Sequence, residues 1–248
     1  MKKLIMVAGS AALMANVAIA DNHEEAEDMV GRMYIEYVKP EMRSDYESVI
    51  SDWNDCIAEA DSEMHWHVYR PETGDLGRYA YSIGDRTWAD FDKETPELDA
   101  CYQEFKERYY ASVYKVHGSF DIYMDEHSHH VDDDVDRPIA MVTVFDLDDP
   151  RAFLENVKKY TEAAGENEWK DPYYFYSGIG GEGATGLYVV SPVENFSDFD
   201  GDNGFWKMLS DHFGEEEFEK MREQDRAAIN SYYTDIWKRD DELSSSHD

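Results

Sequence analysis

The sequence predicts an α+β chain made of two tandem β-α-β-β-α-β units, and three observations lead to this fold class. The chain has 248 residues, which is enough to bury a sizeable core. Two long stretches of it match each other at a constant offset. Within each stretch, β-rich segments and amphipathic helical patterns follow in the same order. We therefore expect two copies of one structural unit.

The internal repeat has an offset of 108 residues. WADFD at 88–92 aligns with FSDFD at 196–200, and the register holds without a gap for about sixty residues. Further aligned pairs are Met33 with Met141, Tyr37 with Phe145, Arg43 with Arg151, Glu47 with Glu155 and Val49 with Val157. Near the end, DIYMDE at 121–126 aligns with DIWKRD at 235–240, so six residues have been added between. A two-fold repeat explains these matches best.

Each copy begins with a β-rich segment, at 33–39 and at 139–147. A helix follows, because apolar residues recur in steps of three and four and so share one helical face. These residues are Tyr46, Val49, Ile50, Trp53 and Ile57 in the first copy, and Phe153, Val157, Tyr160 and Ala164 in the second. Two strands around a glycine-containing turn come next, and a second helix and a last strand close each copy.

Two glycine-containing stretches of the second copy have a simple structural interpretation. GIGGEG at 178–183 precedes a strand rather than a helix, so it indicates a hairpin turn and not a phosphate loop. The six added residues lie near GFWKMLSDHFG, which predicts a short extra helix that ends at Gly214.

The order β-α-β-β-α-β is that of the ferredoxin-like unit, a four-stranded antiparallel sheet with both helices on one face. The other face of each sheet needs cover, and two copies can bury these faces against each other. By element order, repeat and aromatic strands, the chain resembles the dimeric α+β barrel superfamily, which includes antibiotic-biosynthesis-monooxygenase-like and NIPSNAP-like domains. The resemblance covers roughly residues 31–240. It implies a pseudo-dimeric α+β barrel with a ligand cavity between the sheets.

This topology predicts a disulfide between Cys56 and Cys101, the two cysteines of the chain. The two helices of a ferredoxin-like unit run antiparallel, so the end of the first lies beside the start of the second. Cys56 falls late in the first helix and Cys101 early in the second, and both lie on the apolar stripes. A pair of buried free thiols is the alternative.

The N-terminus has the pattern of a secretory signal peptide at 1–20. Lys2 and Lys3 precede a short apolar stretch, and Ala18 and Ala20 supply the small residues before the cleavage point. A membrane anchor is the alternative, but the apolar run is shorter than the ~20 residues that a span needs. We therefore expect a periplasmic or secreted protein, in a compartment that permits a disulfide.

The remaining boundaries follow from the repeat. An acidic N-terminal segment occupies 21–31, the first unit 32–126, an acidic and histidine-containing linker 127–138, the second unit 139–240 and a disordered tail 241–248. The linker contains DEHSHHVDDDVDRP, whose acids predict a solvated connection. Its alternative is a divalent-ion site formed by His127 and His129 with Asp132.

The charge excludes two classes of partner. The formal net charge is −33, and loss of the two signal lysines brings it near −35. Such a chain is not expected to bind nucleic acid or, after signal cleavage, a membrane surface. Either the charge maintains solubility in a salty environment, or it recognises a cationic partner. Whether the protein forms an oligomer is left open.

The candidate site starts from HWH at 65–67. Residues i and i+2 of a strand share a face, so His65, His67 and Tyr69 are expected to point the same way. Two histidines in this spacing can supply metal ligands, but a third ligand is needed. Arg78 alternates with apolar residues on the neighbouring strand and is placed on the same inner face.

Other strands complete the expected cluster. Met33, Ile35 and Tyr37 look like the helix-facing set of the first strand, which places Glu36 on the inner face. By the same alternation Asp121 and Tyr123 point inward. In the second copy, Tyr174 and Tyr176 are the expected inward members of an aromatic run.

These residues leave three functions open. The first is an exported protein that binds a small apolar or aromatic molecule between the sheets. The second is an enzyme on the same scaffold, since the resemblance implies cofactor-independent oxygenases and haem-handling proteins. The third is an interaction protein without a pocket, whose acidic surface is the active feature. Apart from these functions, the polar cluster can also be a hydrogen-bonded barrel lining or a solvated face without catalysis. No cofactor is predicted from the residues themselves, and haem or a divalent metal at His65 and His67 stays an alternative.

Overall fold

The computed structural model describes residues 29–245, except for 61, 63, 181–185 and 202. The expected signal peptide, most of the acidic N-terminal segment and residues 246–248 lie outside this part. The first half contains β1 (Val30–Val38), α1 (Arg43–Glu59), β2 (Trp66–Pro71), β3 (Arg78–Arg86), α2 (Pro96–Ser112) and β4 (Val113–Tyr123). The second half contains β5 (Ile139–Leu147), α3 (Pro150–Glu166), β6 (Tyr174–Ile179), β7 (Leu187–Val193), α4 (Phe205–Phe213), α5 (Glu215–Ala228) and β8 (Ile229–Ser245).

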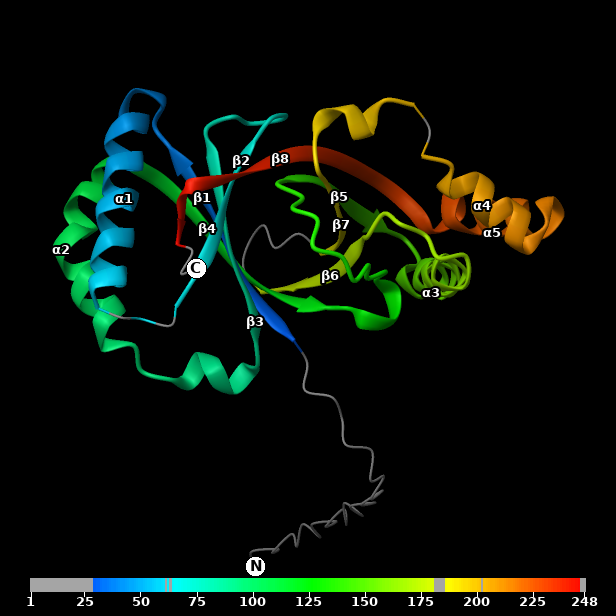
Figure 1. Cartoon of the computed structure of the whole chain (residues 1–248), viewed down its shortest axis with the longest axis horizontal. Helices are drawn as coiled ribbons and strands as arrows, with labels where there is room; N and C mark the ends of the chain where they lie inside the picture. The colour runs from blue at the N-terminus through cyan, green and yellow to red at the C-terminus, as the bar shows by residue number, and fades with distance from the viewer. Residues whose placement is uncertain (1–28, 61, 63, 181–185, 202, 246–248) are drawn as a thin grey trace, which may run out of the picture.

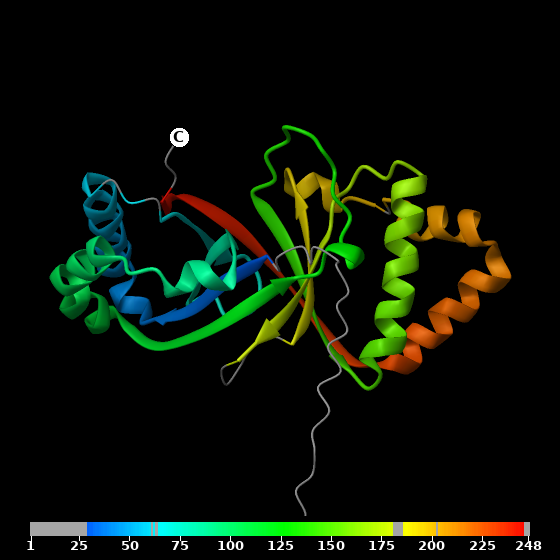
Figure 2. The same cartoon turned by 90° about the horizontal axis from the view of Figure 1, so that it is seen from below.

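The eight strands form one closed antiparallel barrel in the order β1-β3-β2-β8-β5-β7-β6-β4. The strands of each half stay together, as β4-β1-β3-β2 and as β8-β5-β7-β6. Two seams join the halves, where β2 pairs with β8 and β4 pairs with β6. In Figure 1, α1 and α2 lie on one side of the strands and α3, α4 and α5 on the other. Figure 2 shows the same separation from below. The fold class is α+β.

Helix-facing side chains form a core on each side of the barrel. On the first side, α1 buries Tyr46, Val49 and Ile57 against residues of β2 and β3 such as Val68 and Tyr79. On the other side, Phe153 and Val157 of α3 pack with Phe175 of β6. Burial of one such aliphatic or aromatic side chain contributes roughly 1.5–3 kcal/mol, so these clusters fix the helices on the sheets. Among the helices of the described residues, none combines the length and apolarity that a membrane crossing requires.

The expected disulfide is confirmed. Cys56 of α1 and Cys101 of α2 are bonded, with 45 residues of sequence separation between them. Cys101 is buried within the core beneath the two helices, and Cys56 packs against that core. The bond therefore ties the two helices of the first half together.

The hairpin and the extra helix of the second half also have counterparts in the structure. β6 and β7 pair antiparallel, and the connection at 181–185 lies outside the described residues. α4 ends at Gly214, whose φ of 82° is in the left-handed region that glycine occupies without strain.

The C-terminal segment was expected to be a disordered tail, and for 241–245 that is wrong. β8 continues through Ser245 along β2, and Leu243 is buried in the core of the first half. The hydroxyl oxygens of Ser244 and Ser245 each accept a backbone N–H bond, from Val68 and Trp66, at 2.9 Å. The serine-rich composition of this segment suggested a polar tail. In the structure, these hydroxyls take the place of the backbone acceptors of a regular β-ladder.

Replacing Ser244 with alanine is expected to lower the free energy of unfolding by about 1–3 kcal/mol, since the buried N–H of Val68 loses its acceptor. Urea denaturation followed by circular dichroism measures the change. Glu242→Ala, at an exposed neighbouring position, is the matched control and should change stability by less than about 0.5 kcal/mol. Equal, negligible effects of both substitutions would contradict the docking of this segment.

Candidate functional site

A cavity of about 620 Å³ lies inside the barrel, between the strands of the two halves. Much of its wall is apolar and comes from both halves. These side chains include Met33, Ile35, Ala80, Ala140, Val142, Val190 and Trp237. Tyrosines, two serines, two histidines and a few charged groups form most of the rest of the wall, so the cavity is mainly aromatic and apolar with isolated polar points.

The face assignment of β1 from the sequence is wrong. Met33, Ile35 and Tyr37 line the cavity, whereas Glu36 points to the helix side. Strict alternation identifies two faces of a strand, but it does not say which face meets the helices. Apolar and aromatic residues occur on both faces of β1, because one face meets the helix core and the other lines the cavity, so hydrophobicity could not distinguish them.

Glu36 instead forms a buried hydrogen-bonded cluster beneath α1 and α2. Tyr46 donates to its Oε2 and Tyr109 to its Oε1, each at 2.6 Å. The hydroxyls of Tyr46 and Tyr81 lie 2.5 Å apart. Burial raises the pKa of Glu36, and the hydrogen bonds from Tyr109 and Tyr46 oppose that rise. This carboxyl has no access to the cavity and is part of the core.

His65 and His67 do not belong to the cavity lining. β2 begins at Trp66, so His65 precedes the strand, and both imidazoles are exposed. His67 shares the strand face of Tyr69, with ring centroids 6.5 Å apart, but Tyr69 alone of the HWHVY segment lines the cavity. Trp66 and Val68, on the opposite face, reach the helix core as alternation requires.

Six of the nine expected ligand-binding residues line the cavity. They are Tyr69, Arg78, Asp121, Tyr123, Tyr174 and Tyr176. The sequence interpretation missed further polar lining residues, which are Ser82, His117, Ser119, His130, Tyr188, Tyr233 and Asp235. Alternation along the predicted strands of the second copy was the signal that could have found Tyr188 and Asp235.

Asp121 is the most buried charged group of the cavity wall, with 3% of its surface exposed. Ser119 donates to its Oδ1 at 3.3 Å, and the hydroxyl of Tyr188 also donates to it. Burial raises the pKa of Asp121, while the bonds from Tyr188 and Ser119 and the charge of Arg32 act in the opposite direction. The ring of Tyr188 stacks on Tyr176 at 5.2 Å. A carboxylate has about four lone-pair positions, so Asp121 can accept further bonds from a ligand.

A second polar point of the cavity wall lies at the other end of β1 from Asp121. Nη2 of Arg78 is 2.9 Å from Oδ2 of Asp235, and the two side chains are 17% and 14% exposed. Nε of Arg78 donates to the backbone oxygen of Asp75 at 3.1 Å, and the guanidinium lies 4.9 Å from the ring of Trp237. The ion pair makes this point neutral overall while several N–H groups of the guanidinium remain available.

The linker contributes to the site and is less solvated than expected. His130 lines the cavity, hydrogen bonds through Nε2 with the Tyr123 hydroxyl, and packs on Tyr174 at 5.2 Å. His129 is buried, and its Nε2 lies 2.8 Å from the backbone oxygen of Trp169. Its backbone pairs with Tyr173, so this part of the linker docks on the second sheet.

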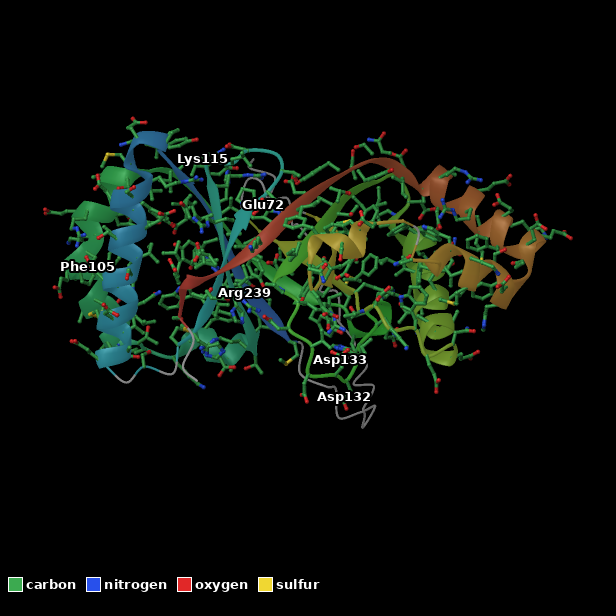
Figure 3. All side chains as sticks on the ribbon, turned by 45° about the horizontal axis from the view of Figure 1, so that its top comes forward. Glu72, Phe105, Lys115, Asp132, Asp133 and Arg239 are labelled. Carbon is green, nitrogen blue, oxygen red and sulfur yellow. A yellow bond between two sulfur atoms is a disulfide. The ribbon has the colours of Figure 1, made fainter. Side chains whose placement is uncertain are left out.

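The divalent-ion alternative for the linker has no geometric support. His129 uses its Nε2 in the core, while Asp132 is exposed and lies with Asp133 on the outer part of the connection (Figure 3). Across the described part of the chain, no group of three or more histidine, cysteine or acidic side chains can hold a metal ion.

No protein-family model matches the sequence, and no curated protein matches it. Solved structures do match. One is described as a candidate monooxygenase from Lactobacillus acidophilus, with a TM-score of 0.50 and 14% identity over 86% of this chain and 94% of that one. Another, a candidate monooxygenase from Fusobacterium nucleatum, has a TM-score of 0.52 and 12% identity over 86% of this chain and 93% of that one. Chlorite dismutase from Candidatus Nitrospira defluvii, in complex with imidazole, has a TM-score of 0.51 and 11% identity, over 86% of this chain and 92% of that one.

The chain has the dimeric α+β barrel fold. The strand order and the helices on the two outer sides of the barrel agree with this assignment. At such low identity, the likeness establishes the fold and leaves the chemistry of the site to its own residues.

The cavity of this dimeric α+β barrel does not fit a haem. Haem carries two carboxylates, yet the charged lining groups are Asp121 and Asp235 against the single guanidinium of Arg78, which is already paired. Axial histidines normally donate their second ring nitrogen to a partner. Among the described residues His117 has no such partner. The lining therefore favours an uncharged ligand.

Proposed function

We propose that the barrel cavity binds a small, uncharged, largely apolar or aromatic molecule and holds one of its polar groups at Asp121. The observation that carries the proposal is a carboxylate that is 3% exposed and faces a largely apolar and aromatic cavity of about 620 Å³. A volume of this size suits a drug-sized ligand, and a few convergent polar groups are typical of such sites. Ser119 and Tyr188 hold the carboxylate in place, so it is preorganised to accept an O–H or N–H.

The test uses N-phenyl-1-naphthylamine, a neutral aromatic dye with one N–H whose fluorescence rises in apolar surroundings. We expect saturable binding, and Asp121→Asn should weaken it about 10- to 100-fold, since a hydrogen bond to a charged group contributes about 1.5–3 kcal/mol. Val142→Phe, which fills the cavity, should abolish binding. The double variant His65→Ala and His67→Ala is the control outside the lining and should bind normally. Full binding by a folded Val142→Phe variant would place the dye elsewhere and reject the proposal.

A second candidate function is proton abstraction from the bound molecule, as in a cofactor-independent oxygenase. The raised pKa of Asp121 suits it to act as a general base toward an activated C–H or O–H. The resulting substrate anion is electron-rich and can pass electrons to dioxygen. Neighbours described as monooxygenases share the fold, which supports this candidate at the level of the scaffold.

Dioxygen uptake in the presence of a panel of di- and trihydroxylated aromatic compounds tests this second function. Uptake that disappears in Asp121→Asn and persists in the His65 and His67 double variant would support it. No uptake with any compound, in a protein that binds the dye, would exclude the oxygenase and leave the binding function.

We further propose that the two halves are tandem ferredoxin-like copies and that the protein is exported. The strand orders of the two halves, β4-β1-β3-β2 and β8-β5-β7-β6, support the first statement. The two orders are the same when β5, β6, β7 and β8 are taken as the repeat partners of β1, β2, β3 and β4. The signal-like pattern at 1–20 and a disulfide in the first half support the second.

A further inference from the structure

We infer that the ligand of this cavity is an elongated, uncharged molecule with a hydrogen-bond donor at one end and a carbonyl-type acceptor at the other. This inference rests on the proposed binding function and names the class of ligand. It comes from the two polar points of the wall, their chemistry and their separation along the barrel.

Asp121 defines the end that requires a donor. It is an acceptor in its ionised form, and the hydroxyls of Ser119 and Tyr188 occupy only part of its acceptor capacity. Its wall neighbours on the same strand face are Ser119 and Tyr123, so the approach to its free lone pairs is from the cavity. A hydroxyl or N–H group of the ligand satisfies this carboxylate.

Arg78 defines the end that requires an acceptor. Its guanidinium has five N–H donors. One is directed at Asp75 and one at Asp235, and the described residues supply no hydrogen-bond acceptor for the others. Asp235 balances the charge and would repel a ligand carboxylate at the same point. A neutral carbonyl, as in an ester, ketone or amide, fits these donors without that repulsion.

The two points lie at opposite ends of β1. Arg78 of β3 pairs with Tyr37, and Asp121 of β4 pairs with Gly31. Six residues of strand separate these partners, which corresponds to ~20 Å between the backbone positions. The cavity extends along this whole distance, because residues from Gly31 to Tyr37 of β1 line it.

The wall between the two points is mainly apolar, and its polar members are Ser82 and Ser119 beside Met33 and His117 beside Ile35. Met33 and Ile35 of β1 face Val142 and Val190 of the second half, with Trp237 beside them. Over most of this stretch, a polar group in the middle of a ligand would lose hydration without gaining a partner. The chemistry of the wall thus describes a molecule that is polar at both ends and apolar between them.

Displacement of N-phenyl-1-naphthylamine by methyl ω-hydroxyalkanoates tests the inference. Chains of about six to about sixteen carbon atoms cover lengths up to the ~20 Å separation of the backbone positions. Matched 1-alkanols carry only the donor, and matched methyl alkanoates carry only the acceptor. We expect a maximum of affinity at one chain length, where the two-ended compound binds at least 10-fold more tightly than either single-ended one.

Two variants assign the ends. In Asp121→Asn, the hydroxyl of the ligand should no longer increase affinity, while the ester should still increase it. In Arg78→Met, the ester should no longer increase affinity, while the hydroxyl should still increase it. Arg78→Lys preserves the charge beside Asp235 with fewer donors, so it should lose less of the affinity contributed by the ester than Arg78→Met does. This variant keeps the test valid if Arg78→Met is unstable.

The outcomes separate this inference from the binding function beneath it. Equal displacement at all lengths, or equal affinity of one- and two-ended compounds, overturns the inference while the cavity remains a binding site. Tighter binding of the ω-amino esters, which are cationic, overturns the uncharged class. A protein that never binds the dye loses the binding function and the inference together.

Discussion

Replacing both Cys56 and Cys101 with alanine is expected to lower the free energy of unfolding by about 4 kcal/mol, the value of the chain-entropy model for a closed loop of 45 residues. In the unfolded chain, the bond excludes the many conformations in which residues 56 and 101 lie far apart. For a protein of this size the loss corresponds to a decrease of roughly 8–16 °C in Tm. Chemical denaturation of the two proteins measures it directly.

Reduction of the unsubstituted protein provides the matched control, because the described chain has no free cysteine to confuse the result. Tris(2-carboxyethyl)phosphine should lower the stability of the unsubstituted protein towards that of the double variant and should leave the variant unchanged. A double variant as stable as the oxidised protein would show that the disulfide does not restrict the unfolded chain.

Replacing Glu36 with leucine is expected to lower the free energy of unfolding by about 2–5 kcal/mol, because buried hydroxyls that lose their acceptor each cost about 1–3 kcal/mol. Tyr109 then has no carboxylate to donate to, and Tyr46 keeps only its contact with Tyr81. The leucine fills similar volume, so the effect reports the hydrogen bonds rather than a cavity. Urea denaturation at neutral pH measures the loss.

Glu36 should also make stability depend on pH. Its pKa in the folded protein is raised above the ordinary value of 4.5, so the folded state binds its proton more tightly than the unfolded state does. Stability therefore falls as pH rises from 4.5 through the folded pKa, and below 4.5 this loss is absent. In Glu36→Gln the loss cannot occur, so the variant should gain stability relative to the unsubstituted protein across this interval.

Glu41→Gln is the control for that comparison, since it removes the same charge at an exposed position. Its difference from the unsubstituted protein should stay nearly constant over the same pH interval. A Glu36→Gln variant that tracks this control would show that Glu36 is not desolvated in the folded state.

The elements were predictable because their signals are local. The stripe of Tyr46, Val49, Ile50 and Ile57 defined α1, and the antiparallel helices of the expected unit led to the disulfide. The end of β8 was not predictable, because hydroxyl groups of Ser244 and Ser245 replace ladder acceptors there. Composition alone identifies such a segment as a polar tail.

The site was predicted only in part for a different reason. Tyr69, Asp121 and Tyr176 were placed correctly because alternation determines which residues share a face. Glu36 was misplaced because neither face of β1 is an exposed outer surface, so the hydrophobicity of the residues does not tell which face meets the helices. The pairing of Arg78 with Asp235 joins residues 157 positions apart and depends on barrel closure, which a local pattern does not encode.

The course of β8 determines when the barrel can form during synthesis. This strand carries residues 229–245, pairs with β5 in its own sheet and then closes the seam against β2 of the first half (Figure 1). Until β8 has been synthesised, β2 therefore presents an unpaired edge, and such edges promote association between chains. A variant that lacks the β8 residues paired with β2 would expose that edge permanently, so association between chains is the expected consequence of removing them.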